Sequence, residues 1–191
     1  ETDEDVKGIY DLTMRVMKAC RAITKRVNIT VSVSNFVPKP HTPFQWQSQM
    51  NFDDMNRKHK ILRDLFDRAK GCSLKIHGKK KSYLEGFLSR GDEKTGDLIE
   101  LAWKKGAKLD DYTDNFDIWM EAISELKMSD TEYLGERGLD ADLPWDIVEI
   151  GVTKEFLKSE YKKAQEEALT PECRVQCSGC GMKKLFPNCV S

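Results

Sequence analysis

The stretch from residue 28 to residue 46 constrains the fold of this chain most, because it permits a strand and forbids a helix. Residues 28–34 alternate between apolar and small polar side chains, with the two-residue period of a β-strand. One face carries Ile29, Val31 and Val33, and the other carries Thr30, Ser32 and Ser34. Three prolines then fall within residues 38–43, where they exclude a helix and stiffen an extended loop. Two interpretations stay open: an edge strand with a solvated face, or a barrel strand with its apolar face against helices and its hydroxyls toward a ligand.

Helices are predicted on both sides of this stretch. Before it, apolar side chains recur every three or four positions over residues 3–24, and Thr2 with Asp5 forms a capping-box pattern at the start. After it, the chain reads as a series of helices from residue 51 to about residue 167, with a short strand at 74–77. Ser82 with Glu85 suggests a second capping box, and the three lysines before it suggest a solvated turn. The predicted class is therefore α/β to mostly α.

Composition excludes several classes of protein. The 31 Lys and Arg residues nearly cancel the 32 Asp and Glu residues, leaving a net charge of −1, so no overall field favours nucleic acid. No stretch of about 18 apolar residues exists that could cross a membrane. The acidic first residues do not resemble a signal peptide, so we expect a cytoplasmic protein and no membrane partner.

Four of the six cysteines fall within the last 19 residues. They follow the spacing C-x3-C-x2-C with one further cysteine, namely Cys173, Cys177, Cys180 and Cys189. Thiolates at such spacings can surround one metal or cluster, and Gly179 and Gly181 permit the tight turns that this requires. Zinc and an iron–sulfur cluster both suit four cysteines. A disulfide-bonded or free-thiol tail is the alternative, which the lack of a secretory signal disfavours.

Several segments together resemble the closing part of a radical SAM enzyme, within a bacterial branch that carries an N-terminal cobalamin-binding-like domain and whose members are described as Fe–S oxidoreductases. The segments are ETDED at 1–5, VSVSNFVPKPHTPFQW at 31–46, SYLEGFLSRGD at 82–92, LAWKKGA at 101–107, LPWD at 143–146 and GVTKEFL at 151–157. The pair Thr42-Pro43 stands where such enzymes end the last barrel strand in a Pro-rich segment. The Cys-rich tail matches as well, so the resemblance extends over essentially the whole chain.

The resemblance implies three regions: the end of a partial (β/α) barrel over residues 1–50, a mostly helical domain over 51–170 and a Cys-rich tail over 171–191. It implies that the full enzyme binds SAM and a [4Fe–4S] cluster, with cobalamin as a further expected cofactor. The SAM-binding candidates in this chain are the inward strand face and the loop after it: Thr30, Ser32, Ser34, Asn35, Phe36 and Pro38.

The resemblance places the three-cysteine motif of the radical-generating cluster upstream of this chain. We therefore assign the tail cysteines to a zinc or auxiliary Fe–S site, name no catalytic residue here and expect the chain to be inactive alone. Its expected partners are SAM and the N-terminal part of its own enzyme, and its substrate is open. The competing hypothesis is a helical binding module whose structural zinc knuckle docks RNA or a protein.

Overall fold

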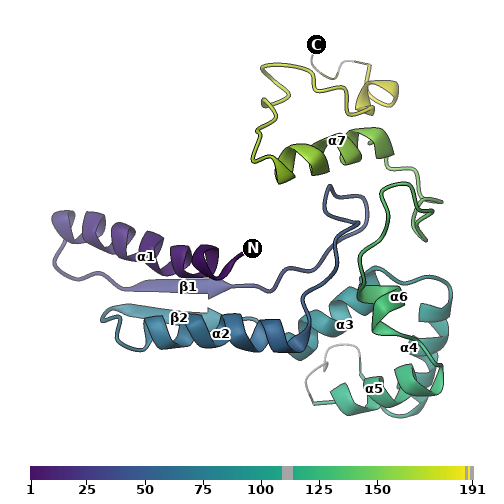
Figure 1. Ribbon diagram of the computed structural model, residues 1–191, viewed down its shortest axis with the longest axis horizontal. Helices are drawn as coiled ribbons and strands as arrows, with labels where there is room; N and C mark the ends of the chain where they lie inside the picture. Colours follow the sequence, from purple (N-terminus) through teal and green to yellow (C-terminus); the bar gives the residue numbers. More distant parts are fainter. Residues whose placement is uncertain (109–113, 188, 190–191) are drawn as a thin grey trace. The chain divides into compact units, whose positions relative to one another are not determined.

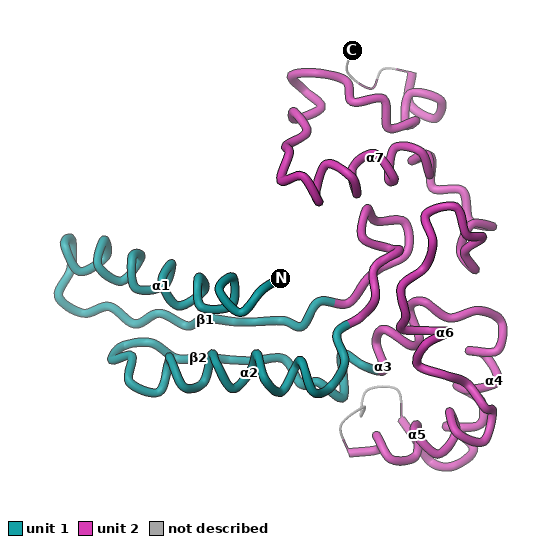
Figure 2. The backbone as a smooth tube through the Cα atoms, viewed as in Figure 1, with its two compact units in different colours: residues 1–36, 50–83 teal, residues 37–49, 84–191 magenta. Residues whose placement is uncertain are grey.

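The computed structural model describes residues 1–108, 114–187 and 189, which divide into two compact units (Figure 2). The first unit comprises Glu1–Phe36 and Met50–Tyr83, and the second comprises Val37–Gln49 and Leu84–Ser191. These units follow contacts within the chain. The expected regions, residues 1–50, 51–170 and 171–191, stay predictions.

The first unit alternates helices and strands. In chain order it contains α1 (Asp3–Ile23), β1 (Ile29–Val33), α2 (Phe52–Phe66) and β2 (Cys72–Ile76) (Figure 1). The two strands pair in parallel, with Ile29 opposite Cys72 and Val33 opposite Ile76. Parallel strands need a long crossover, and α2 lies within it. The strand predicted over residues 28–34 is thereby confirmed.

The beginning of α1 follows from local hydrogen bonding. The Thr2 hydroxyl accepts from the backbone N–H of Asp5 at 3.3 Å, and the Asp5 carboxylate accepts from the backbone N–H of Thr2 at 2.6 Å. This is the reciprocal arrangement that the sequence predicts. At α2, the Asn51 side chain likewise accepts from the backbone N–H of Asp54 at 2.8 Å.

Both helices of the first unit pack on one face of the strand pair. Val6 of α1 and Leu62 and Phe66 of α2 form the buried centre of this cluster. The surrounding apolar side chains include the helix-facing positions of both strands: Val31, Val33, Cys72, Leu74 and Ile76. The apolar face of β1 therefore meets helices, as the alternation predicts.

The second unit is helical. Its helices are α4 (Lys94–Lys104), α5 (Phe116–Glu125), α6 (Asp130–Leu134) and α7 (Lys154–Gln165), with a short 3-10 turn at Met182–Lys184. Trp46, Trp145, Leu157 and Tyr161 belong to one buried cluster around the first turns of α7. The described chain is thus a mixed α/β structure, mostly helical with a two-stranded parallel sheet, which confirms the coarse fold class.

One predicted helix start is wrong. Helix α3 (Lys79–Ser89) begins at Lys79, so the lysine run lies in its first turn and Ser82 lies inside the helix. Ser82 is fully buried, and its hydroxyl accepts a hydrogen bond from the Asn35 side chain at 2.9 Å. A tertiary contact therefore explains this serine. Among the described residues, no helix is long and apolar enough to span a bilayer.

Candidate functional site

The face of the β1–β2 pair opposite the helices is open and lined by small polar groups. Thr30, Ser32 and Ser34 are all exposed, while the intervening residues of β1 are half-buried. The Thr30 and Ser73 hydroxyls lie 3.0 Å apart and share a hydrogen bond. Three of the six predicted SAM-binding residues are therefore brought together on one surface that a ligand can reach.

Sequence reasoning missed the contribution of β2 to this surface. Ser73 and Lys75 are exposed and lie opposite Thr30 and Ser32 in the parallel register. The signal was present, because residues 72–76 alternate in the same way as β1. Lys75 adds a cation to a face that β1 lines with hydroxyls alone.

Asn35, another predicted SAM-binding residue, belongs to a hydrogen-bond network inside the first unit. Its amide nitrogen donates to the backbone carbonyl of His77 at 3.1 Å and to the Ser82 hydroxyl at 2.9 Å. Its oxygen lies 2.6 Å from Nε2 of His59. Since the Asn35 nitrogen faces a carbonyl oxygen, its own oxygen must be the acceptor, and His59 donates through Nε2. Burial, followed by the charges of Arg63 and Lys79, lowers the pKa of His59.

The last two SAM-binding candidates fall in different units. Phe36 ends the first segment of the first unit and is 42% exposed. Pro38 is fully buried and belongs to the second unit. Among the SAM-binding candidates, only the three hydroxyl-bearing residues of the strand face therefore lie together on one exposed surface. The assignment of Asn35, Phe36 and Pro38 to SAM stays a prediction.

All four tail cysteines line one cavity of about 400 Å³ in the second unit. Cys173 and Cys177 are exposed, and Cys180 and Cys189 are half-buried. Thr170, at the beginning of the tail, donates to the Glu160 carboxylate at 2.7 Å and anchors the tail to α7.

A close contact between two glycines holds the tail against the beginning of α7. The backbone carbonyl of Cys180 accepts from the backbone N–H of Thr153 at 2.9 Å. Gly181 takes a φ of 103°, and a Cβ there would lie 2.7 Å from the carbonyl oxygen of Gly151. Both the left-handed conformation and the close approach require glycine. Cys180 is thereby fixed while Cys173 lies on the exposed part of the tail.

The donor set fits a thiolate-bound metal, since four cysteines within 19 residues suit both tetrahedral zinc and a fully ligated cluster. In the described part of the chain, however, no three Cys, His, Asp or Glu side chains stand close enough together to hold an ion. Metal binding at this cavity would therefore require the exposed part of the tail to close on Cys180. The four ligand assignments stay predictions.

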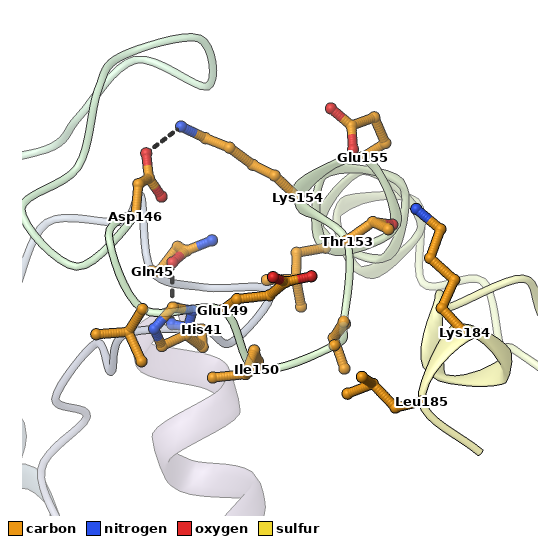
Figure 3. A pocket seen from close by; sticks show the side chains of 14 residues that line it. His41, Gln45, Asp146, Glu149, Ile150, Thr153, Lys154, Glu155, Lys184 and Leu185 are labelled. Atoms are coloured by element: carbon orange, nitrogen blue, oxygen red, sulfur yellow. Dashed lines mark hydrogen bonds and ion pairs between the residues drawn. The ribbon is translucent and has the colours of Figure 1, made fainter.

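A second cavity, of about 460 Å³, lies between the Pro-rich segment and the beginning of α7 (Figure 3). His41 and Gln45 lie on one side of it, and Asp146 pairs with Lys154 at 2.6 Å on another. His41 has a φ of 56°, in the left-handed region that costs a side-chain-bearing residue energy. The residue is half-buried.

Gln45 fixes the conformation of this loop. Its side-chain oxygen accepts from the backbone N–H of His41 at 3.0 Å and from the indole N–H of the buried Trp145 at 2.6 Å. Both partners are N–H donors, so the atom of Gln45 that lies between them must be the side-chain oxygen and not the amide nitrogen. The Pro-rich segment is thus held to the Leu-Pro-Trp-Asp turn at residues 143–146 by a buried side chain.

Comparison with known proteins gives one relative of uncharacterized function. The chain is 27% identical over 135 residues to an uncharacterized protein of Methanocaldococcus jannaschii, a match that covers 64% of this chain and 28% of that protein. No protein-family profile and no solved structure matches the chain. The aligned region therefore spans less than a third of the relative's length.

Proposed function

We propose that this chain is the C-terminal part of a radical SAM enzyme and that the open face of β1 and β2 forms part of its SAM-binding wall. One observation carries the proposal: both helices cover one face of a parallel strand pair and leave a row of hydroxyls on the other. A (β/α) barrel places its helices outside and its strand side chains inside in this way. The resemblance of the linear motifs to radical SAM enzymes supplies the reaction class.

The length of the archaeal relative supports a longer enzyme, because the matched region covers only 28% of it. In the proposed enzyme, a [4Fe–4S] cluster bound upstream of this chain would supply the electron for reductive cleavage of SAM into methionine and a 5′-deoxyadenosyl radical, and this radical would abstract a hydrogen atom from the substrate. The residues of this chain bind and orient. Thr30, Ser32 and Ser34 offer hydroxyls to the polar edges of SAM, and Lys75 offers a positive charge to its carboxylate. We place the enzyme in the cytoplasm, with cobalamin as a further cofactor.

The test measures the KM for SAM in the longer protein that contains this chain, reconstituted anaerobically with iron and sulfide. Ser32→Leu places a bulky apolar group on the open face, and we expect KM to rise at least about tenfold through lost hydrogen bonds and steric exclusion. Ser124→Leu, at an exposed position of α5, is the matched control and should leave KM unchanged. An unchanged KM in Ser32→Leu would contradict the assignment of this face to SAM.

For the tail, we propose that Cys173, Cys177, Cys180 and Cys189 hold zinc or an auxiliary Fe–S cluster. Support comes from their position around one cavity. Elemental analysis of anaerobically purified protein separates the two: iron with acid-labile sulfide supports the cluster, and zinc alone supports a structural site. Zinc together with no SAM binding by the longer protein would favour the second candidate function, a helical binding module whose zinc knuckle docks RNA or a protein.

A further inference from the structure

Two arginines of the second unit lie side by side without a carboxylate partner. Arg90 is 0% exposed, and one of its nitrogens, Nη2, donates to the backbone carbonyl of Gly135 at 2.9 Å. Its Nε and Nη1 atoms are buried and have no hydrogen-bond partner among the described residues. A buried cation with unused donors is costly, because it has lost water without gaining an equivalent partner.

Arg137 adds a second cation at the same place. Its Nη2 atom donates to the backbone carbonyls of Arg90 at 3.0 Å and Glu132 at 3.2 Å, and its guanidinium lies 4.9 Å from the ring centroid of Trp145. Burial, followed by the charge of Arg137, lowers the pKa of Arg90 to about 10. Within the described chain, neither guanidinium forms an ion pair, although Asp92 and Glu132 lie near enough to Arg137 to counteract the lowering of its pKa by burial.

Both arginines line one cavity of about 280 Å³ whose charge changes from its inner to its outer part. Arg90 is the most buried lining residue, and Arg137 is half-buried. The lining carboxylates Glu132 and Asp142 belong to exposed residues. The third, Asp92, is already used, since it accepts from the Tyr133 hydroxyl at 3.1 Å and from the backbone N–H of Lys94 at 3.0 Å. Arg90 thus lies deepest, Glu132 and Asp142 lie near solvent, and Asp92 is half-buried like Arg137.

We propose that this cavity binds a small zwitterion of amino-acid size, with its carboxylate toward Arg90 and Arg137 and its ammonium group toward Glu132 and Asp142. A carboxylate supplies the acceptor that the buried guanidinium lacks, in the strongest class of hydrogen bond available to it. A phosphate dianion fits less well, because two exposed carboxylates would repel its second charge. The volume lies just below the usual range of about 300–1,000 Å³ for small-molecule sites, which limits the ligand to about this size.

The test is an NMR titration of the ¹⁵N-labelled 191-residue chain with L-alanine, acetate and methylammonium, observed at the Arg90 and Arg137 Nε–H resonances. We expect saturable shifts with alanine and with acetate, with alanine bound about fivefold more tightly because of its ammonium group. Methylammonium alone should leave the two arginine resonances in place. No arginine shift with any probe at 50 mM, or equal affinity for alanine and acetate, would overturn the proposal.

Variants separate the two halves of the site. Arg137→Gln should weaken both alanine and acetate at least about tenfold, whereas Arg174→Gln in the exposed tail is the control and should change neither. Asp142→Asn should reduce the preference for alanine over acetate about twofold. Backbone amide spectra verify folding, and Arg137→Lys provides a second test if Arg137→Gln unfolds, since the retained charge should preserve acetate binding. An unaltered preference in Asp142→Asn would contradict the assignment of the ammonium group.

Discussion

Substitution of Asn35 by alanine should destabilise the first unit by about 3 kcal/mol. The side chain makes three hydrogen bonds, to the His77 carbonyl, the Ser82 hydroxyl and His59 Nε2, at 3.1, 2.9 and 2.6 Å. At about 1 kcal/mol each, their loss gives the stated figure. Ser82 is 0% exposed and His59 is 7% exposed, so bulk water does not reach these groups and does not replace the lost hydrogen bonds. The loss in the free energy of unfolding should therefore not fall much below about 3 kcal/mol.

Urea unfolding followed by far-UV circular dichroism provides the assay, with hydrogen exchange of the peptides that cover Glu1–Phe36 as a local probe of the first unit. Asn28→Ala is the matched control, because Asn28 is exposed and immediately precedes β1; it should change stability by less than about 0.5 kcal/mol. Asn35→Asp keeps the acceptor for His59 but cannot donate to the His77 carbonyl, so it should also destabilise. A loss below 1 kcal/mol in Asn35→Ala, or an equal loss in the control, would refute the structural role of this network.

Three further results are expected. Because the pKa of His59 is lower in the folded protein than in the unfolded chain, the unfolded chain binds a proton at a higher pH than the folded protein does. The contribution of His59 to the free energy of unfolding should therefore be fully present above pH 6.5 and fall as the pH drops below it. His59→Gln should flatten that dependence in urea titrations at pH 5 and 7.5. Gly181→Ala should release the tail from Gly151 and increase hydrogen exchange over residues 170–187, whereas normal protection would contradict the close contact. Gln45→Met should cost about 2 kcal/mol in thermal or urea unfolding by leaving the buried Trp145 indole N–H without its acceptor, and a change below 0.5 kcal/mol would refute this.

Local patterns predicted the elements, and tertiary contacts decided the roles of individual polar side chains. The alternation over residues 28–34 identified β1 and its helix-facing side, because the period of a strand is a local property. The prediction that Ser82 caps a helix was wrong. Its hydrogen bond with Asn35 joins positions 47 residues apart, so no local pattern indicates it. Arg90 directly follows the last residue of α3 in a charged stretch of the sequence, yet it is fully buried. Nothing in a local pattern reports such burial.

In the tail, too, the spacing of residues is visible in the sequence, whereas their tertiary contacts are not. The four cysteines line one cavity, and the prediction that they share one metal or cluster stays a prediction. The sequence alone could not predict the contact of Cys180 and Gly181 with Thr153 and Gly151. That contact depends on the beginning of α7, which lies some 30 residues earlier in the chain. The spacing of the cysteines is a local property of the sequence, whereas the anchoring of Cys180 follows from tertiary packing.

Reductive cleavage of SAM tests the central proposal most directly. The longer protein that contains this chain, reconstituted anaerobically with iron and sulfide and reduced with dithionite, should convert SAM to 5′-deoxyadenosine and methionine in equal amounts. The 191-residue chain treated in the same way should form neither product, because the proposed radical-generating cluster lies upstream. Absence of 5′-deoxyadenosine from the longer protein with its cluster loaded, or its formation by the 191-residue chain alone, would contradict the account.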